Sequence, residues 1–337
     1  MKKRIHLVAF SIGAIIAVLL TFIKLPYYVT MPGTAQKLEP LVHVKGGDQD
    51  DGDFMLTTVR MGRANVISYA LAKVRKYYEL YPVEAIKQQG ESDEEYTLRQ
   101  LHMMEDSKQT AIAVAYEKAG KPITYKFLGV YVVRVLPDMP ASQYLRAGDR
   151  IVEVDGKKLQ SAEQFIEYVG QKTKGESVKI TFERKGKKKT VQLALQPFPE
   201  HPKRVGIGIS LVTDSEIVTD PPVEIKSEEI GGPSAGLMFS LEIYNQLIEE
   251  DITKGYTIAG TGTINEKGEI GPIGGISQKI IAADKAGADI FFAPNEKGAK
   301  DSNYREALKT AKDIGTKMKI VPVDTFDEAL RYLQTLK

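Results

Sequence analysis

A serine in a glycine- and proline-rich turn, placed directly before an apolar helix, constrains this chain more than any other feature. The turn is the segment 229–236, Glu-Ile-Gly-Gly-Pro-Ser-Ala-Gly, and its serine is Ser234. Pro233 suits the first position of a helix, so we expect a helix to run from Pro233 to about Ile248. The free N–H groups at the start of this helix would face the serine and could stabilise a developing negative charge.

A lysine on the apolar face of a second predicted helix is the candidate base for this serine. Lys279 has apolar or small neighbours three and four residues away, namely Ile276, Ala282 and Ala283. An ordinary lysine has a pKa of about 10.4. Burial among apolar groups favours the neutral amine and lowers that pKa by several units. A neutral Lys279 could take the proton of Ser234 and return it to a leaving amine.

The same serine motif allows two other interpretations. Residues 232–236 fit Gly-x-Ser-x-Gly, the nucleophile elbow of α/β-hydrolases, but that fold needs a histidine after the serine in chain order. All four histidines precede Ser234: His6, His43, His102 and His201. This order counts against a hydrolase of small esters. An inactive peptidase fold that only binds peptides is the remaining alternative to an enzyme, and an intact serine–lysine pair argues against it.

Composition excludes several functional classes. Lys and Arg number 46 against 44 Asp and Glu, a net charge of +2 that gives no support to nucleic-acid binding. The absence of cysteine excludes disulfides, thiolate catalysis and cysteine-ligated metals. The acidic turn 47–53 lacks the spacing of a calcium loop, and no P-loop motif occurs. We therefore predict no metal, no cofactor and no nucleic-acid partner.

The N-terminus has the pattern of a membrane anchor. Three basic residues at 2–4 precede an apolar run from Leu7 to Ile23, whose length of about 17 residues is near the lower limit for a spanning helix. No cleavage site of small residues follows it, although a cleaved signal peptide is the alternative. Residues that suit the headgroup region come next: Lys24, Tyr27 and Tyr28. We predict a single-pass anchor within residues 1–30, with its N-terminus cytoplasmic and the remainder outside the cell membrane.

Residues 31–121 read as an α/β segment. Short strands are expected at 41–44 and 54–59, and the apolar spacing predicts a helix over 65–78. A capping box at Ser92 and Glu95 opens a long helix that runs toward Gly120.

Residues 122–198 change to short strands around one helix capped by Ser161. This unit resembles a PDZ domain of the bacterial type on four motifs: Phe127-Leu128-Gly129-Val130, Met139-Pro-Ala141, Ala147–Ile151 and Val154–Lys157. The resemblance implies that a bound peptide adds a strand to the sheet edge, with Phe127, Leu128, Gly129 and Val130 as the loop that receives its carboxylate. A β-rich spacer without a ligand is the alternative.

Residues 199–337 read as an α/β domain that begins with a strand at 205–211. The domain resembles the proteolytic domain of Lon-type peptidases on four motifs: Gly232–Gly236, Thr261–Ile264, Gly268–Gly275 and Lys279–Gly287. The resemblance implies Ser234 as nucleophile, Lys279 as general base and Thr261 as the residue that orients the lysine. Many members of that family carry an acidic residue at the position of Gly231, where this chain departs from the pattern.

Taken together, the sequence predicts a mixed α+β and α/β protein with a transmembrane helix, a PDZ-like domain and a Lon-type proteolytic domain. Residues 53–62 faintly resemble an early strand of the same proteolytic domain, so we expect the PDZ-like unit to be inserted within it. The resemblance to membrane-tethered Lon-type proteases of Gram-positive bacteria implies an ATP-independent serine endopeptidase. Its implied substrates are membrane-tethered or unstructured proteins, including a cell-division inhibitor in DNA-damage recovery. Lon-type domains commonly form homo-oligomeric rings.

Overall fold

The computed structural model describes residues 6, 11, 20–47, 51–227 and 230–337. Most of the predicted membrane anchor lies outside these residues. Among the residues that are described, no helix is both long enough and apolar enough to cross a membrane.

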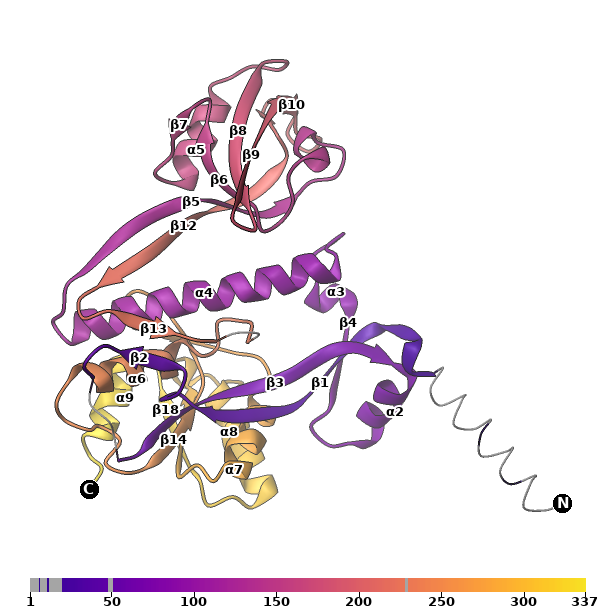
Figure 1. The fold of residues 1–337 in the computed structure, drawn as a ribbon. Helices are drawn as coiled ribbons and strands as arrows, with labels where there is room; N and C mark the ends of the chain where they lie inside the picture. The colour runs from indigo at the N-terminus through magenta and orange to yellow at the C-terminus, as the bar shows by residue number, and fades with distance from the viewer. Residues whose placement is uncertain (1–5, 7–10, 12–19, 48–50, 228–229) are drawn as a thin grey trace.

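The main sheet combines strands from both ends of the chain (Figure 1). Its order is β18-β17-β14-β3-β1-β4, in which β3, β14, β17 and β18 run parallel and β1 runs antiparallel to β3 and β4. The strands span Lys24–Lys37 (β1), Asp53–Asn65 (β3), Glu79–Pro82 (β4), Thr257–Gly260 (β14), Ile290–Pro294 (β17) and Lys319–Val323 (β18).

Helices cover both faces of this sheet. The helices α4 (Asp93–Lys118), α6 (Gly236–Leu247) and α9 (Phe326–Leu333) share one apolar core with the side chains of Phe54 and Leu56. Met55, between those two residues, points to the opposite face and packs with α7 (Ile276–Lys285) and α8 (Asn303–Ile314). Successive strand residues face opposite sides, so β3 needs apolar residues on both faces and lies in the middle of the domain.

The predicted strands and helices of 31–121 join this sheet rather than forming a separate body. β3 pairs in parallel with β14, while β2 (Val42–Val44) pairs with β13 (Val223–Ile225). Two short helices, α2 (Val66–Val74) and α3 (Val83–Ile86), flank β4. The capping box predicted at Ser92 and Glu95 is present at the start of α4.

The structure corrects the boundary predicted for the anchor at residue 30. Residues 24–30 form the first half of β1, and Tyr28, Val29 and Thr30 are buried in the domain. The Tyr28 hydroxyl donates to Asp93 at 3.2 Å. Tyr28 therefore belongs to the folded domain, not to a lipid headgroup layer, because its hydroxyl finds a carboxylate partner within the protein.

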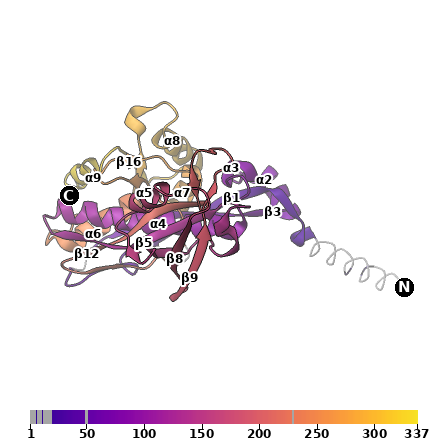
Figure 2. The same ribbon diagram turned by 90° about the horizontal axis from the view of Figure 1, so that it is seen from above.

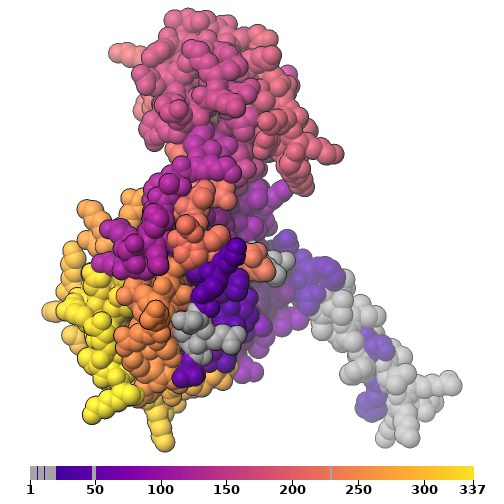
Figure 3. Space-filling model, turned by 60° about the vertical axis from the view of Figure 1, so that its left-hand side comes forward, coloured from indigo at the N-terminus to yellow at the C-terminus, as the bar shows by residue number. Residues whose placement is uncertain are grey.

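A second sheet, with the order β12-β5-β6-β8-β9, forms the PDZ-like lobe (Figures 1 and 3). Its helix is α5 (Ala162–Gly170), and β7 (Lys157–Lys158) pairs with β6 at its edge. The strands span Ile123–Val135 (β5), Arg150–Val154 (β6), Ser177–Arg184 (β8), Lys187–Ala194 (β9) and Ile209–Thr219 (β12). The short strands β10 (Gln196–Pro197) and β11 (Val205–Gly206) pair beside it.

This second sheet continues past residue 199, where the sequence predicts the peptidase unit to start. β12 pairs antiparallel with β5 from Ile209 to Thr219, so the PDZ-like lobe extends to residue 219. The sequence pattern of 205–211 shows a strand but not its partner, and the partner here lies on the PDZ side. β5 and β12 together enter and leave the lobe.

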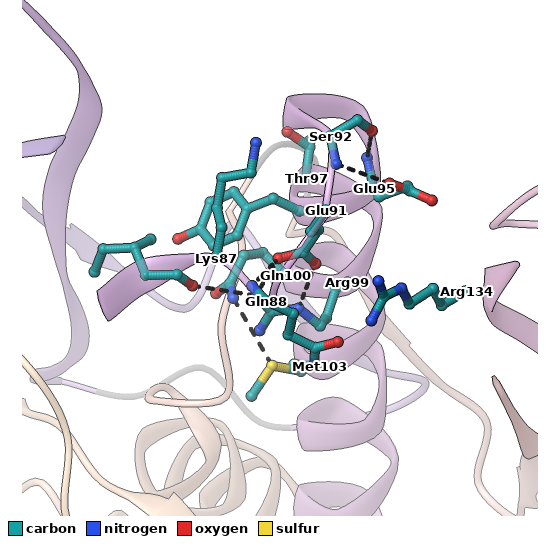
Figure 4. Close-up of polar contacts among 12 residues, drawn as sticks. Lys87, Gln88, Glu91, Ser92, Glu95, Thr97, Arg99, Gln100, Met103 and Arg134 are labelled. Atoms are coloured by element: carbon teal, nitrogen blue, oxygen red, sulfur yellow. Dashed lines mark hydrogen bonds and ion pairs between the residues drawn. The ribbon is translucent and has the colours of Figure 1, made fainter. Parts of the chain in front are cut away.

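The long helix α4 lies between the two sheets, and Figure 2 shows β5 and β12 running along it. Near its start, Glu91 forms a two-pronged ion pair with Arg99, with N–O distances of 2.7 and 2.9 Å (Figure 4). Arg134 of β5 donates to the Gln89 carbonyl at 2.5 Å, and the ring of Tyr131 stacks on His102 at 4.4 Å. These contacts attach the lobe to the main domain through α4.

Candidate active site

Ser234 and Lys279 meet between α6 and α7. The Lys279 amine lies 2.8 Å from the Ser234 hydroxyl oxygen, within hydrogen-bond reach. The same amine donates to the Thr261 hydroxyl at 2.9 Å and to the Thr57 carbonyl at 2.9 Å. The structure thus brings together the three residues that the sequence singled out and adds a fourth, Thr57.

The lysine amine is buried. Only 2% of Lys279 is exposed, and burial lowers the pKa of Lys279 to about 7. The cause is desolvation, which penalises the charged ammonium and leaves the neutral amine unaffected. A neutral amine has two N–H bonds and one lone pair. If the two bonds point to Thr57 and Thr261, the lone pair faces the hydroxyl of Ser234.

Thr261 fixes both partners at once. It follows the last residue of β14, and its hydroxyl donates to the Ser234 carbonyl at 2.9 Å while accepting from Lys279. The N–H of Gly262 also donates to the Ser234 carbonyl, at 2.9 Å. The serine backbone is therefore held from two sides, independently of its hydroxyl.

The turn that carries Ser234 is packed against α4 and β15 (Thr263–Ile264). The Ser107 hydroxyl on α4 donates to the Pro233 carbonyl at 3.0 Å. A methyl group at Gly236 would come within 2.8 Å of Ile264 and 2.9 Å of Ser107, so only glycine fits this close approach. The sequence prediction that the helix begins at Pro233 is wrong, because Ser234 and Ala235 form a turn and α6 begins at Gly236.

The turn that carries Ser234 also has backbone N–H groups that could donate to a substrate. The Leu237 N–H donates to the Gly262 carbonyl, so it is not free for a substrate. Within the described part of the chain, the N–H groups of Ser234 and Ala235 donate no hydrogen bond. They lie beside the serine hydroxyl and are the donors available to a developing oxyanion.

Lys279 is placed by the start of α7. Gly275 caps this helix with a φ of 72°, and a side chain there would come within 2.8 Å of Val59 on β3. The helix can therefore lie close enough to β3 for the lysine to reach the carbonyl of Thr57 on the same strand.

Sequence reasoning missed Thr57, Ser107 and Gln100. Thr57 acts through its carbonyl, which any residue would supply, and Ser107 and Gln100 come from a helix distant in the chain. The Gln100 carbonyl accepts from the Gly232 N–H at 2.8 Å, and Gln100 lies 2.9 Å from where a Gly231 side chain would begin. The acidic residue of the related pattern would collide with α4 at this position.

The four residues predicted to hold a peptide carboxylate do not form a loop. Phe127, Leu128, Gly129 and Val130 lie within β5, with β12 along one edge and β6 pairing at Val130 on the other. They therefore lie in a strand rather than in the loop that was predicted, and their role in binding a peptide stays a prediction.

A groove of about 740 Å³ lies elsewhere in the lobe, between α5 and the segment 203–211. Phe165, Ile166 and Val169 of α5 form one wall. The opposite wall includes the start of β12, which is the edge strand of its sheet.

Within the described residues, no group of three or more His, Cys, Asp or Glu side chains could hold a metal ion.

Known proteins match both the PDZ-like lobe and the main domain. The PDZ domain family matches residues 99–195, and the Lon protease (S16) C-terminal proteolytic domain family matches residues 166–335. The chain is 32% identical over 102 residues to the Lon protease of Metamycoplasma arthritidis, covering 30% of this chain and 11% of that protein. It is 31% identical over 144 residues to the Lon protease of Trichlorobacter lovleyi, covering 43% and 16%. The chain thus spans only a small part of these relatives.

Among solved structures, the PDZ domain of an SdrC-like protein from Listeria monocytogenes is 38% identical, with a TM-score of 0.24, and covers 26% of this chain and 90% of that one. The contacts of Ser234 and Lys279 described above all fall in the second matched region or on strands and helices packed against it. That region, residues 166–335, is about half of the 337 residues. The chain belongs to the family of the Lon protease (S16) C-terminal proteolytic domain.

Proposed function

We propose that this chain is an ATP-independent serine endopeptidase that uses Ser234 as its nucleophile and Lys279 as its general base. The observation that carries the proposal is the 2.8 Å contact between the buried Lys279 amine and the Ser234 hydroxyl. Membership of a peptidase family supports the reaction type, and the absence of a P-loop motif supports independence from ATP.

The reaction proceeds in two halves. The neutral Lys279 amine takes the hydroxyl proton as the Ser234 oxygen bonds to the substrate carbonyl carbon, and the Ser234 and Ala235 N–H groups face the resulting oxyanion. The ammonium then protonates the departing amine as the C–N bond breaks, leaving an ester on Ser234. Water attacks this ester and gives a proton to Lys279. The same proton returns to the serine oxygen as the acid product leaves.

The test is cleavage of an unstructured protein by the full chain. Ser234→Ala and Lys279→Met should each abolish cleavage, whereas Ser142→Ala, an exposed serine in the PDZ-like lobe, should leave it intact. Full activity of Lys279→Met would exclude the amine as base. If neither variant loses cleavage, the result favours the rival class, in which this chain is a binding scaffold and a copurifying peptidase cleaves the substrate.

We infer that the PDZ-like lobe recruits substrates through the groove between α5 and β12. An extended peptide could add to the free edge of β12 while its side chains pack on Ile166 and Val169 of α5. Recruitment raises the local concentration of a tail near Ser234. The targets that we propose are short or disordered proteins, a class that includes the membrane-tethered division inhibitor implied by resemblance.

We propose the domain organisation as a peptidase domain, residues 24–121 and 220–337, interrupted by the PDZ-like lobe. The pairing of β3 with β14 supports it, since the C-terminal part alone would lose strands that cover its core. An excised 220–337 fragment should not fold. A stable, active fragment of this length would contradict the proposal.

The cellular location is likewise a proposal. We place the anchor before β1, within residues 1–23, with the N-terminus cytoplasmic and the catalytic part outside a Gram-positive-type cell. Protease added to intact cells should then digest the catalytic part and spare the N-terminal end. Sedimentation of detergent-solubilised chain would show whether it forms the homo-oligomer common among Lon-type domains.

A further inference from the structure

An exposed apolar stripe runs along α2. Ile67, Leu71 and Val74 recur at helical spacing on one face, with 37, 41 and 80% of each residue exposed. No residue of this nine-residue helix is buried. Scattered exposed aliphatic residues are ordinary, but a contiguous row of three marks an interaction surface.

The opposite side of α2 is attached to the sheet. The Tyr69 ring lies 5.3 Å from the ring of Tyr27 on β1. A capping box between Asn65 and Ser68 fixes the first turn of the helix, with both N–H groups satisfied. The helix is therefore held in one orientation, with its apolar stripe turned away from the domain.

The helix α2 lies near the point where β1 begins (Figure 1). Lys24, the first residue of β1, pairs with Asn65, the residue that caps α2. Phe22 and Ile23 precede it and are 77 and 49% exposed. The apolar sequence run that ends at Ile23 thus joins the folded domain beside the stripe.

The sequence around the stripe is rich in basic residues. The segment 54–78 contains five basic residues and no Asp or Glu. Lys73 on α2 and Arg75 at its C-terminal cap are exposed, Arg60 is exposed on β3, and Lys76 pairs with Asp313 of α8. An apolar face flanked by basic side chains is the pattern of a helix that lies in the plane of a membrane interface.

We propose that α2 docks onto an anionic lipid surface, with Ile67, Leu71 and Val74 in the headgroup–acyl boundary and the flanking basic residues on lipid phosphates. The inference builds on the proposed anchor, which would bring the same end of the β1–β3 hairpin to the bilayer. A second contact fixes the tilt of the catalytic domain, whereas an anchor alone leaves the domain free to rotate. The active site is then held at a fixed height above the membrane, close to the point where the chain of a membrane-tethered substrate leaves the bilayer.

The absence of cysteine allows single probes to be introduced. Leu71→Cys and Val74→Cys would each carry a nitroxide in the full chain, reconstituted in phosphatidylcholine vesicles with or without phosphatidylglycerol. Val218→Cys is the matched control, an apolar residue 47% exposed at the far end of β12. We expect the probes at 71 and 74 to be several-fold less accessible to a water-soluble nickel chelate than the probe at 218. The contrast should grow with phosphatidylglycerol.

Equal chelate accessibility at all three positions, in vesicles that carry the chain when they float, would overturn the docking and leave the anchor standing. Failure of the chain to float with either lipid would overturn both. Spin–spin broadening that disappears on dilution with unlabelled chain would show a second copy on the stripe and would also overturn lipid docking. Cleavage of a soluble unstructured protein by the same samples reports on the proposed peptidase separately.

Discussion

Lys279 contacts Ser234 across 45 residues of sequence, and its amine is the only titratable group within hydrogen-bond distance of that hydroxyl in the described part of the chain. The amine is buried by α7 and β3, and the hydroxyl is presented by the turn before α6. Proton transfer between them depends on burial, because an exposed lysine would be protonated at neutral pH.

The activity should therefore depend on pH through Lys279. The neutral amine is the active form, and its pKa of about 7 predicts that kcat/KM falls as the pH drops through 7. A pH series with an unstructured substrate measures this limb. An activity that stays constant from pH 6 to 9 would contradict the assignment.

The burial of Lys279 also has a consequence for stability. The folded-state pKa of about 7 lies below the ordinary 10.5, so between these values the unfolded chain binds the extra proton and stability rises with pH. Lys279→Met should be more stable than wild type at pH 7, and the gap should shrink by several kcal/mol, an order-of-magnitude figure, toward pH 10. Denaturant midpoints at both pH values measure the gap. Lys285→Met, exposed on the same helix, should show no such change.

Thr261 contacts Lys279 and Ser234 through its hydroxyl, so substitutions that keep or remove this hydroxyl can separate its effect on activity from that of the methyl group. Thr261→Val removes an acceptor from the Lys279 amine and should lower kcat/KM by roughly 10- to 100-fold, the cost of one hydrogen bond to a charged group. It should also move the acidic limb of the pH profile to lower pH, since the ammonium loses a partner. Thr261→Ser keeps the hydroxyl and should restore both quantities.

Gly236 tests the packing of the nucleophile turn. Gly236→Ala would force its new methyl group against Ile264 and Ser107, and overpacking of this kind costs about 1–3 kcal/mol. Thermal unfolding measures the loss. Gly170→Ala on α5 meets nothing within 4 Å and provides the control. Equal stability of the two variants would show that the turn is not tightly packed.

The PDZ groove should affect recruitment without affecting chemistry. Ile166→Asp places a charge on the apolar wall of the groove and should raise KM for a protein with a recruited tail by about tenfold. Turnover of a short peptide that reaches only Ser234 should not change. Leu128→Asp, at the position first predicted to bind peptide, should leave KM unchanged if the groove between α5 and β12 is the binding site.

The candidate residues Ser234 and Lys279 could be predicted from the sequence because their surroundings are local. Ser234 lies in a distinctive turn, and the apolar spacing around Lys279 shows one buried face of a helix. The carbonyl of Thr57 and the support from Ser107 were not accessible, because both depend on which distant strand and helix pack against the turn.

The PDZ-like lobe shows a different limit. Strand spacing predicted that 205–211 was extended, but not that β12 would pair with β5. A strand's partner is set by tertiary pairing rather than by its own pattern, so the sequence did not show that the lobe continues past residue 199 or that residues 127–130 lie within β5. Likewise, aromatic residues after an apolar run suit a membrane surface, yet Tyr28 is buried in β1.

The most direct test is titration of the lysine side chains in the full chain by carbon NMR, with Lys279→Met to assign the resonance. We expect one lysine that titrates near pH 7 and disappears in the variant, while exposed lysines titrate near their ordinary value. If the Lys279 resonance titrates together with the exposed lysines, the amine is charged at neutral pH and cannot be the base for Ser234.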